Sequence, residues 1–405
     1  MSNNAQPEIW FPGFTEGWEQ HKLIEVARYR NGKAHEQAID ESGKYIVVNS
    51  KFVSTNGRVK KYTNIIIDPL KKNELAFVLS DVPNGKAIAR TFLVDKEHRY
   101  SLNQRIAGIT PHKDTDSYFL NVLMNRNPYF LKFDNGVGQT NLTKADVENF
   151  IGHYPSYEEQ QKIGMFFKQL DDTIALHQRK LDLLKETKKG FLQKMFPKNG
   201  AKVPEIRFPG FTEAWEQRKL GGIGKTYTGL TGKSKEDFGH GDAKFVTYMN
   251  VFQNPKATLE QLENVEIDHR QNEVKKGDVF FTTSSETPEE VGMSSVWTHD
   301  INNIYLNSFT FAYRPTIKFD LDYLAFMLRS QSVRKKIIFL AQGISRYNIS
   351  KTKMMDISVP IPVNFEEQQK IGAFFKQLDD TIALHQRKLD LLKETKKGFL
   401  QKMFV

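Results

Sequence analysis

The chain of 405 residues contains no cysteine. This absence excludes disulfide bonds, zinc sites with thiolate ligands and cysteine nucleophiles. No run of 18 apolar residues is present to cross a bilayer as a helix, and the first residues, Met1 to Gln6, are polar, unlike a signal peptide. The sequence therefore predicts a cytoplasmic protein.

Motifs of catalysis are also missing. Gly221 to Thr226 resembles the end of a phosphate-binding loop, but Lys219 stands where that motif requires glycine. Asn127-Pro-Tyr-Phe130 resembles the Asn-Pro-Pro-Tyr/Phe motif of adenine methyltransferases without its second proline, and no glycine-rich loop for a methyl donor accompanies it. An Asn-Pro that terminates a helix is the simpler interpretation. The ten histidines show no metal-binding spacing. We expect no catalytic residue, cofactor or metal.

The charge balance favours a polyanionic partner. Lysine and arginine total 58 against 48 acidic residues, a net charge of +10. Such a surplus attracts phosphate groups independently of sequence, although many proteins with no nucleic-acid partner are as basic.

An internal duplication organises the chain. Pro7 to Leu23 and Pro204 to Leu220 match at 14 of 17 positions, with Trp10/Arg207, Gly17/Ala214 and His21/Arg218 as the differences. Glu158 to Phe196 and Glu366 to Phe404 differ at one position in 39. Between these frames, Ile24 to Tyr157 and Gly221 to Phe365 are unalike. Uniform drift after a duplication would spread differences evenly, so fixed frames around two exchangeable parts are the better interpretation.

The 39-residue frame has the heptad pattern of a coiled-coil helix. Its mostly apolar a and d positions alternate spacings of four and three, and Pro197 ends the first copy. The two predicted seams are Ile163, Phe167, Leu170, Ile174, His177, Leu181, Leu184, Lys188, Phe191 and Met195, and Ile371, Phe375, Leu378, Ile382, His385, Leu389, Leu392, Lys396, Phe399 and Met403.

Each helix should pair with its twin, because one apolar stripe on a rod of about 57 Å needs a partner. The first helix ends where the second variable region begins, and the second helix starts where that region ends. The two helices should therefore run antiparallel, with His177 and His385 meeting near the centre of a pseudo-two-fold arrangement.

Both variable regions read as mixed α and β segments. Strand-like runs are 45–49, 64–68 and 75–79 in the first region, and 244–248 and 278–282 in the second. Residues 116–125 and 321–340 look helical. The fold class expected is α+β: two globular domains at the ends of a central antiparallel coiled coil.

Polar and cationic side chains cluster in both variable regions and suit contacts with phosphates and base edges, although a solvated surface role fits any single one. The first region contains Asn49, Lys51, Arg58, Lys60, Lys61, Lys86, Arg90, Gln104 and Arg105. The second contains Lys233, Lys235, Tyr248, Asn250, Thr282, Thr283, Ser284, Ser285 and Arg346.

A glycine-led loop recurs near the end of each region, GVGQTNLTK from Gly136 and GISRYNISK from Gly343. Asn141 and Asn348 are placed to cap the segment that follows. They are also DNA-contact candidates, together with the residues just before them, Gln139, Thr140, Arg346 and Tyr347.

These motifs resemble the specificity subunits of type I restriction–modification systems. The resemblance rests on Phe-Pro-Gly-Phe-Thr-Glu-x-Trp-Glu-Gln at Phe11 and Phe208, on Glu-Glu-Gln-Gln-Lys-Ile-Gly at Glu158 and Glu366, and on the run from Gly277 to Gly292. The doubled layout covers the whole chain.

The resemblance implies that each variable domain reads one half of a split, non-palindromic DNA site. The helices would dock two methyltransferase subunits, and motor-nuclease subunits would join for restriction. The methyl donor and ATP would bind those partners, so this chain would carry no cofactor. The expected domains are 1–157 and 204–365 for target recognition, helices at 158–196 and 366–405, and a linker at 197–203.

Two other classes remain open at this point. A coiled-coil scaffold that does not bind DNA would explain the helices, but not two unlike, cation-rich domains on identical stems. A self-contained methyltransferase or nuclease would need the glycine-rich donor loop and the complete Asn-Pro-Pro-Tyr/Phe motif that are missing.

Overall fold

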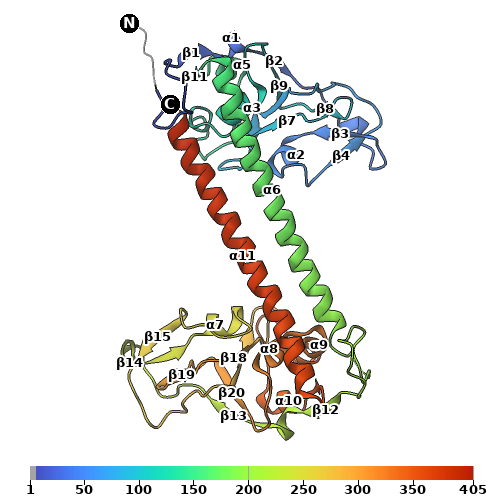
Figure 1. Ribbon diagram of the computed structural model, residues 1–405, viewed down its shortest axis with the longest axis vertical. Coiled ribbons are helices and arrows are strands. Elements are labelled where there is room, and N and C mark those ends of the chain that lie inside the picture. The colour runs from blue at the N-terminus through green and yellow to red at the C-terminus, as the bar shows by residue number, and fades with distance from the viewer. Residues whose placement is uncertain (1–5, 199, 405) are drawn as a thin grey trace. The chain divides into compact units, whose positions relative to one another are not determined.

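A computed structural model describes residues 6–198 and 200–404, which form two compact units. Unit 1 comprises the residues up to Gln178 and from Arg387 onward, and unit 2 comprises Arg179–Gln386. Two long helices, α6 (Tyr157–Lys194) and α11 (Phe365–Met403), contribute one part to each unit (Figure 1). Each unit is thus built from the start of one long helix and the end of the other.

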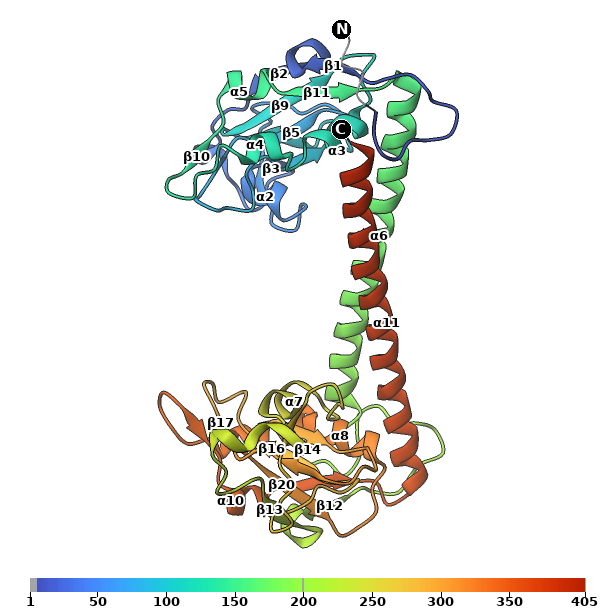
Figure 2. The same cartoon turned by 90° about the vertical axis from the view of Figure 1, so that its left-hand side faces the viewer.

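Unit 1 contains short strands and helices on one flank of its helix segments (Figure 2). In chain order they are β1 (Glu19–Lys22), α1 (Leu23–Val26), β2 (Ala27–Asn31), η1 (Glu36–Ala38), β3 (Tyr45–Val48), α2 (Ser50–Ser54), β4 (Lys61–Thr63), β5 (Leu75–Val78), β6 (Ser80–Asp81), β7 (Thr91–Leu93), β8 (Tyr100–Leu102), β9 (Ile106–Pro111), α3 (Ser117–Met124), α4 (Pro128–Leu131), β10 (Thr140–Asn141), α5 (Lys144–Glu148) and β11 (Ile151–Tyr154).

Unit 2 contains a closely similar series. In chain order they are β12 (Glu216–Lys219), η2 (Leu220–Gly222), β13 (Gly224–Thr228), η3 (Lys235–Asp237), β14 (Phe238–Val246), α7 (Tyr248–Gln253), β15 (Leu262–Val265), β16 (Val279–Thr282), β17 (Ser284–Ser285), β18 (Ser294–Val296), β19 (Ile304–Leu306), β20 (Thr310–Pro315), α8 (Leu321–Arg329), α9 (Gln331–Phe339), β21 (Tyr347–Asn348), α10 (Lys351–Met355) and β22 (Ser358–Ile361).

The sheets of the two units have the same topology. The four-stranded order β2-β9-β5-β7 in unit 1 corresponds to β13-β20-β16-β18 in unit 2, and β4-β3-β8 corresponds to β15-β14-β19. The pairs β3·β8 and β14·β19 are parallel, and the other pairs are antiparallel. Two unlike sequences therefore fold onto one scaffold.

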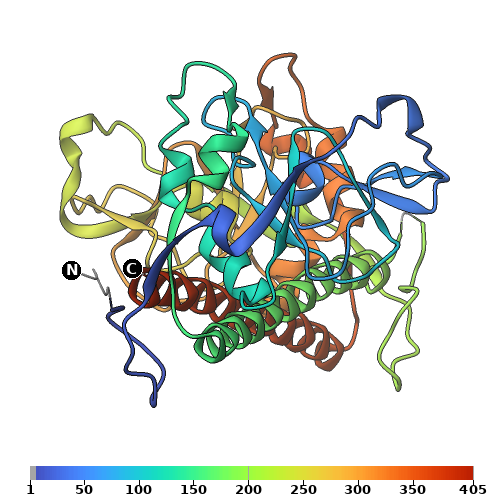
Figure 3. The same ribbon diagram turned by 90° about the horizontal axis from the view of Figure 1, so that it is seen from above.

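The helix segments run antiparallel within each unit. In unit 1 the start of α6 lies beside the end of α11 (Figure 3), with the rings of Phe166 and Phe399 4.8 Å apart. In unit 2 the equivalent rings, Phe374 and Phe191, are 4.9 Å apart. His177 belongs to unit 1 and His385 to unit 2, so their meeting stays a prediction.

The predicted heptad seam is confirmed by burial, since all its residues are buried or partly buried. Its two lysines are neutralised by aspartates that lie off the seam. Lys396 pairs with Asp171 at 2.5 Å in unit 1, and Lys188 pairs with the equivalent Asp379 at 2.5 Å in unit 2. Leucines off the seam, such as Leu183 and Leu391, are 67% and 68% exposed.

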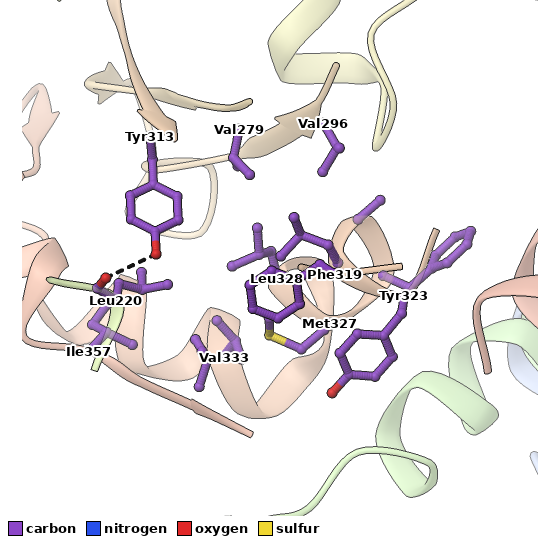
Figure 4. Packing of buried hydrophobic residues seen from close by; sticks show 14 of the residues in the cluster. Leu220, Val279, Val296, Tyr313, Phe319, Tyr323, Met327, Leu328, Val333 and Ile357 are labelled. Atoms are coloured by element: carbon purple, nitrogen blue, oxygen red, sulfur yellow. Dashed lines mark hydrogen bonds between the residues drawn. The ribbon is translucent and has the colours of Figure 1, made fainter. Parts of the chain in front are cut away.

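The end of each long helix completes a hydrophobic core. Met403 and Phe404 pack in the core of unit 1 with Trp18 and Phe119, and Phe196 packs in the core of unit 2 with Trp215. Figure 4 shows part of the unit 2 core, where strand and helix residues interlock and the Tyr313 hydroxyl donates to the Leu220 carbonyl at 2.9 Å.

A glycine in the frame permits the body to sit close to its helix. Asp116 caps α3 by accepting a bond from the Phe119 amide, and Asp320 caps α8 in the same way. A Cβ on Gly164 would clash with the Asp116 carboxylate, and one on Gly372 would clash with that of Asp320. Only glycine fits at these two helix positions.

A buried carboxylate precedes the central strand of each unit. An arginine and a hydroxyl group bond to it in both units, but the strand that carries each of them differs between the units. In unit 1, Glu74 accepts from Arg30 of β2 at 2.9 Å and from the Thr110 hydroxyl of β9 at 3.3 Å. In unit 2, Asp278 accepts from the Tyr227 hydroxyl of β13 at 2.5 Å and from Arg314 of β20 at 2.7 Å. One arginine and one hydroxyl satisfy the carboxylate in both units.

Two local expectations were wrong, and a third, the helical prediction for residues 321–340, is confirmed with a break at Ser330. Residues 64–68 form bends rather than a strand, because Thr63 and Ile65 bond to each other and end β4. Residues 321–340 form two helices, since Ser330 between them has an extended backbone, ψ 152°. Asn127-Pro128 begins α4, because the Asn127 side chain caps the Tyr129 amide.

The seam can be tested by paired substitutions in both helices. Leu181→Asp with Leu389→Asp places carboxylates at sites that are each 1% exposed. We expect a loss of roughly 3–5 kcal/mol in the free energy of unfolding per site, because the transfer of each charge is uncompensated. Denaturant unfolding followed by circular dichroism measures the loss.

The matched control is Leu183→Asp with Leu391→Asp, the same change on the exposed faces of the same helices. It should unfold within about 0.5 kcal/mol of the natural chain. Equal losses in the two double variants would contradict the seam.

Candidate nucleic-acid interface

In unit 1, two loops from other parts of the chain meet directly after the end of the central strand β5. The Leu79 amide donates to the Arg105 carbonyl at 3.0 Å, and the Leu142 amide donates to the Leu79 carbonyl at 2.8 Å. The Gln139 side-chain amide then donates to the Ser80 hydroxyl at 2.6 Å. The turn after β8 and the glycine-led loop are thereby fixed beside the exit of β5.

Unit 2 builds the same edge from other residues. The Thr283 amide donates to the Phe309 carbonyl at 3.4 Å, and the Ile349 amide donates to the Thr283 carbonyl at 3.0 Å. β17 pairs with β21, so that Ser284 faces Asn348 in register, as Ser80 faces Asn141 in unit 1.

We call these places the exit edges. The unit 1 exit edge consists of Ser80, Arg105, Gln139 and Asn141, and the unit 2 exit edge consists of Tyr248, Ser284, Phe309, Arg346, Tyr347 and Asn348. Their exposed guanidinium and amide groups are of the kind that reads base edges in DNA.

The unit 2 exit edge borders a hollow of about 440 Å³ that is lined by residues of α7, of β17 and of the loop at Arg346. The rings of Tyr248 and Phe252 line it and stack at 6.0 Å, and the Tyr248 hydroxyl donates to the Ser284 carbonyl at 2.8 Å. Arg346 reaches the Ser284 hydroxyl at 3.3 Å. An arginine beside flat aromatic faces is suited to a nucleobase.

One partly buried arginine, Arg329, holds α7 in place. Arg329 donates to the Ser294 carbonyl at 2.8 Å and to the Val251 and Phe252 carbonyls at the end of α7, at 3.0 and 3.1 Å. Burial lowers the pKa of Arg329 to about 10, so that it remains charged near neutral pH. The aromatic lining of the hollow therefore rests on a fixed helix.

Several predicted cations lie on α2 and the segments that follow. Asn49 caps α2 by accepting from the Phe52 amide at 2.9 Å. The exposed residues of this group are Lys51, Arg58, Lys60 and Lys61. We call these four exposed cations, which are close together in the sequence, the basic strip; their charge suits phosphates.

Other predicted residues of unit 1 lie near the exit edge with partners of their own. The Arg90 side chain donates to the Lys86 carbonyl at 2.5 Å, and burial together with the charge of Arg126 lowers the pKa of Arg90. Lys86 is exposed, and Gln104, beside Arg105, donates to Glu36.

Structure corrects the expectation for Asn250, which is fully buried. Its side chain donates to the Thr258 carbonyl at 2.8 Å and accepts from the Thr258 amide at 2.9 Å, so it shapes the end of α7 and has no surface for DNA. Thr282 is likewise buried, and its hydroxyl accepts from the Met293 amide.

Three further residues are held by the fold. Lys233 pairs with Asp268 at 3.3 Å and Asp237 at 3.8 Å, and its side chain is 11% exposed. Ser285 is buried and donates to the Thr287 carbonyl, and the Thr283 hydroxyl donates to the Phe309 carbonyl. Lys235 is exposed in η3.

The alternative role of Asn141 and Asn348 as helix caps is wrong. Thr143 caps α5 and Ser350 caps α10, each two residues later in the chain. Both asparagines are exposed at the exit edges.

Sequence reasoning missed Ser80, Phe252 and Phe309. Phe309 is 65% exposed, and its place directly after the polar pair Asn307-Ser308 is a signal that could have found it. Nothing in the local sequence marks Ser80, because its importance comes from its pairing with Asn141.

The described residues contain neither a cluster of metal ligands nor a helix that could span a membrane. No three histidine, aspartate or glutamate side chains there gather closely enough to hold a metal ion. None of the helices described combines the length and hydropathy that crossing a bilayer requires.

Known proteins share this sequence pattern. A family model described as the type I restriction modification DNA specificity domain matches residues 15–186 and again 212–394. The type I restriction enzyme MjaVIII specificity subunit of Methanocaldococcus jannaschii is 23% identical over 401 residues, which are 95% of this chain and 91% of that protein.

Solved structures share the fold. The S subunit of the type I restriction–modification system from M. genitalium aligns with a TM-score of 0.65 at 15% identity over 99% of both chains. A chain from a study of type I restriction–modification complex assembly aligns with a TM-score of 0.54 at 16% identity over 96% of this chain and 98% of that one. With two family matches that together span most of its length, the chain belongs to the specificity subunits of type I restriction–modification systems.

Proposed function

We propose that each unit reads one half of a split DNA site through its exit edge. The observation that carries this proposal is the equivalence of the two edges: one scaffold holds both, and the side chains at their tips differ. Gln139 and Arg105 stand in unit 1 where unit 2 has Arg346 and Phe309 in equivalent loops. Different donors at the same place would select different bases.

The proposed contacts follow the exposure of the predicted residues. Base edges would be read by the exit edges, and phosphates would be held by the basic strip on α2 and the segments after it and by further surface cations. We retain Lys51, Arg58, Lys60, Lys61, Lys86, Gln104, Arg105, Gln139, Asn141, Lys235, Tyr248, Ser284, Arg346, Tyr347 and Asn348 as candidates, with Asn49, Arg90, Thr283 and Ser285 as residues that position them, and leave out Asn250 and Lys233.

We propose that the long helices also dock two methyltransferase subunits. Leu176 and Leu183 lie seven residues apart on α6 and are 60% and 67% exposed, and their equivalents on α11, Leu384 and Leu391, are 44% and 68% exposed. Residues seven apart share a helix face, so each helix carries a second apolar stripe outside the seam. Identical stripes would bind two copies of one partner.

The chain itself would catalyse no reaction. It would act in the cytoplasm, where the host DNA lies. The methyl donor and ATP would be bound by the methyltransferase and by motor-nuclease subunits, which the same complex recruits for restriction. No methyl-donor loop or complete methyltransferase tetrad occurs in the sequence to support another assignment.

The decisive experiment is a map of methylated adenines in cells that carry the complex, with a deletion strain as control. A helix of 38 residues is about 57 Å long and spans about 17 base pairs of 3.4 Å, so a gap of roughly five to eight unread pairs is expected. Because the units differ, the motif should be bipartite and non-palindromic. A continuous motif, or a gap that varies between sites, would refute the proposal.

The docking stripe can be separated from the seam with Leu183→Asp and Leu391→Asp. This double variant should fold, because both sites are exposed, yet fail to assemble with methyltransferase. Size-exclusion chromatography of the mixed subunits measures assembly. Leu183→Met with Leu391→Met, which keeps the stripe apolar, should assemble normally, and assembly of the Asp variant would show that the stripe is not the docking face.

Substitution of Arg346 should affect one half-site only. Arg346→Ala should weaken binding by about 1–3 kcal/mol and relax the sequence preference of the half-site read by unit 2. Lys60→Ala with Lys61→Ala should instead weaken all sequences alike and flatten the salt dependence. Competition binding of the assembled complex to a randomised DNA library distinguishes the two patterns, and a change in the other half-site would contradict the assignment of Arg346.

A further inference from the structure

A buried carboxylate at the start of each long helix has different surroundings in the two units. In unit 2, Glu367 is 1% exposed and is held by Arg207, whose Nε and Nη2 donate to its two oxygens at 2.6 and 2.8 Å. The same Nη2 donates to the Glu213 carbonyl at 2.7 Å. Arg207 and Glu367 thus form a bidentate ion pair, which compensates the buried charge of the Glu367 carboxylate.

Unit 1 keeps the carboxylate and lacks the arginine. Glu159, the equivalent of Glu367, is 3% exposed, and Trp10 occupies the position of Arg207 in the repeat. Burial raises the pKa of the Glu159 carboxyl, and the indole of Trp18 partly opposes this shift by hydrogen bonding. Among the described residues, no cationic side chain forms an ion pair with Glu159.

A pocket of about 110 Å³ opens beside Glu159. Its lining includes Glu16, the equivalent of Glu213, and the aromatic rings of Trp10, Phe14 and Trp18. The groups that surround the Arg207 guanidinium in unit 2 therefore recur in unit 1, where the ring of Trp10 is the one aromatic group added. Trp10 is 50% exposed, which leaves its ring accessible to a planar cation.

The lysine nearest in sequence already has the same position in both units. Lys162 lies over the Phe14 ring at 4.7 Å in unit 1, and its equivalent Lys370 lies over Phe211 at 5.0 Å in unit 2. Since Lys370 coexists with Arg207, Lys162 does not take the place of the missing guanidinium.

We propose that the unit 1 pocket at Trp10 and Glu159 binds a guanidinium group from outside the chain, either the side chain of an arginine on a partner subunit or a free guanidinium compound. The Glu159 carboxylate would accept two hydrogen bonds, the Glu16 carbonyl a third, and Trp10 would cover the planar face. The repeat in unit 2 carries its own arginine and so needs no such ligand.

The free chain tests the pocket with N-acetyl-arginine amide as the probe. At concentrations well above its dissociation constant, the probe should raise the thermal unfolding midpoint of the natural chain by about 2 °C or more. N-acetyl-citrulline amide, which has nearly the same shape and no charge, should have no such effect. Trp10→Arg, which supplies the arginine internally as in unit 2, and Glu159→Gln, which removes the charge, should both abolish the shift.

Arg207→Ala provides the positive control, because it empties the occupied site in unit 2. The probe should restore part of the stability that this variant loses, which shows that the measurement detects a filled pocket. If the probe rescues Arg207→Ala but leaves the natural chain unchanged, or shifts Trp10→Arg and Glu159→Gln as much as the natural chain, the proposal is overturned.

The assembled complex identifies the source of the guanidinium. If a partner arginine fills the pocket, the probe should lose its effect once methyltransferase is bound, and Trp10→Arg should weaken assembly at least tenfold. If a free compound is the ligand, the probe should remain effective in the complex and Trp10→Arg should assemble normally. Only this second measurement depends on the proposed assembly, so failure of docking leaves the result on the free chain intact.

Discussion

Each unit depends on an aromatic side chain delivered by a helix that begins in the other unit. Phe404, after the end of α11, packs against Trp18, Phe119 and Phe167 in unit 1. Phe196, after the end of α6, packs against Trp215, Tyr323 and Phe375 in unit 2. Removal of either ring would leave a cavity beneath a buried tryptophan, at a cost of about 3–5 kcal/mol. The two frames therefore supply the same aromatic residue to the same kind of core.

The variable regions are less constrained. Both units place an arginine and a hydroxyl group at the same buried carboxylate, but these groups come from different strands in the two units. The carboxylate before the central strand is satisfied by Arg30 and Thr110 in unit 1, and by Tyr227 and Arg314 in unit 2. The arginine and the hydroxyl have changed strands, so an alignment of the two sequences shows no match. Neighbouring strands can exchange such partners because both reach the same buried oxygen atoms.

The sequence predicted the repeated architecture well, because the heptad spacing of apolar residues directly indicates a long helix that packs along one face. It predicted local polar roles less well. Asn141 and Asn348 have the chemistry of a cap, but the backbone turns two residues later, at Thr143 and Ser350. Asn250 looks like a surface amide, yet the loop from Asn254 to Gln261 folds over it and uses all its bonding groups. Roles of this kind are set by tertiary contacts that no local pattern contains.

The path of the chain also fixes the order in which the units can be completed during synthesis. Unit 2 is continuous from Arg179 to Gln386, whereas unit 1 requires residues from Arg387 onward, including Met403. Domains generally fold from the N-terminus as they emerge from the ribosome, at about 5–20 residues per second. In this chain the order is reversed, because the core of unit 1 can be completed only after that of unit 2. Unit 1, whose translation starts first, therefore completes its core last, because Trp18 gains Met403 and Phe404 as packing partners only after the end of α11 has been synthesised.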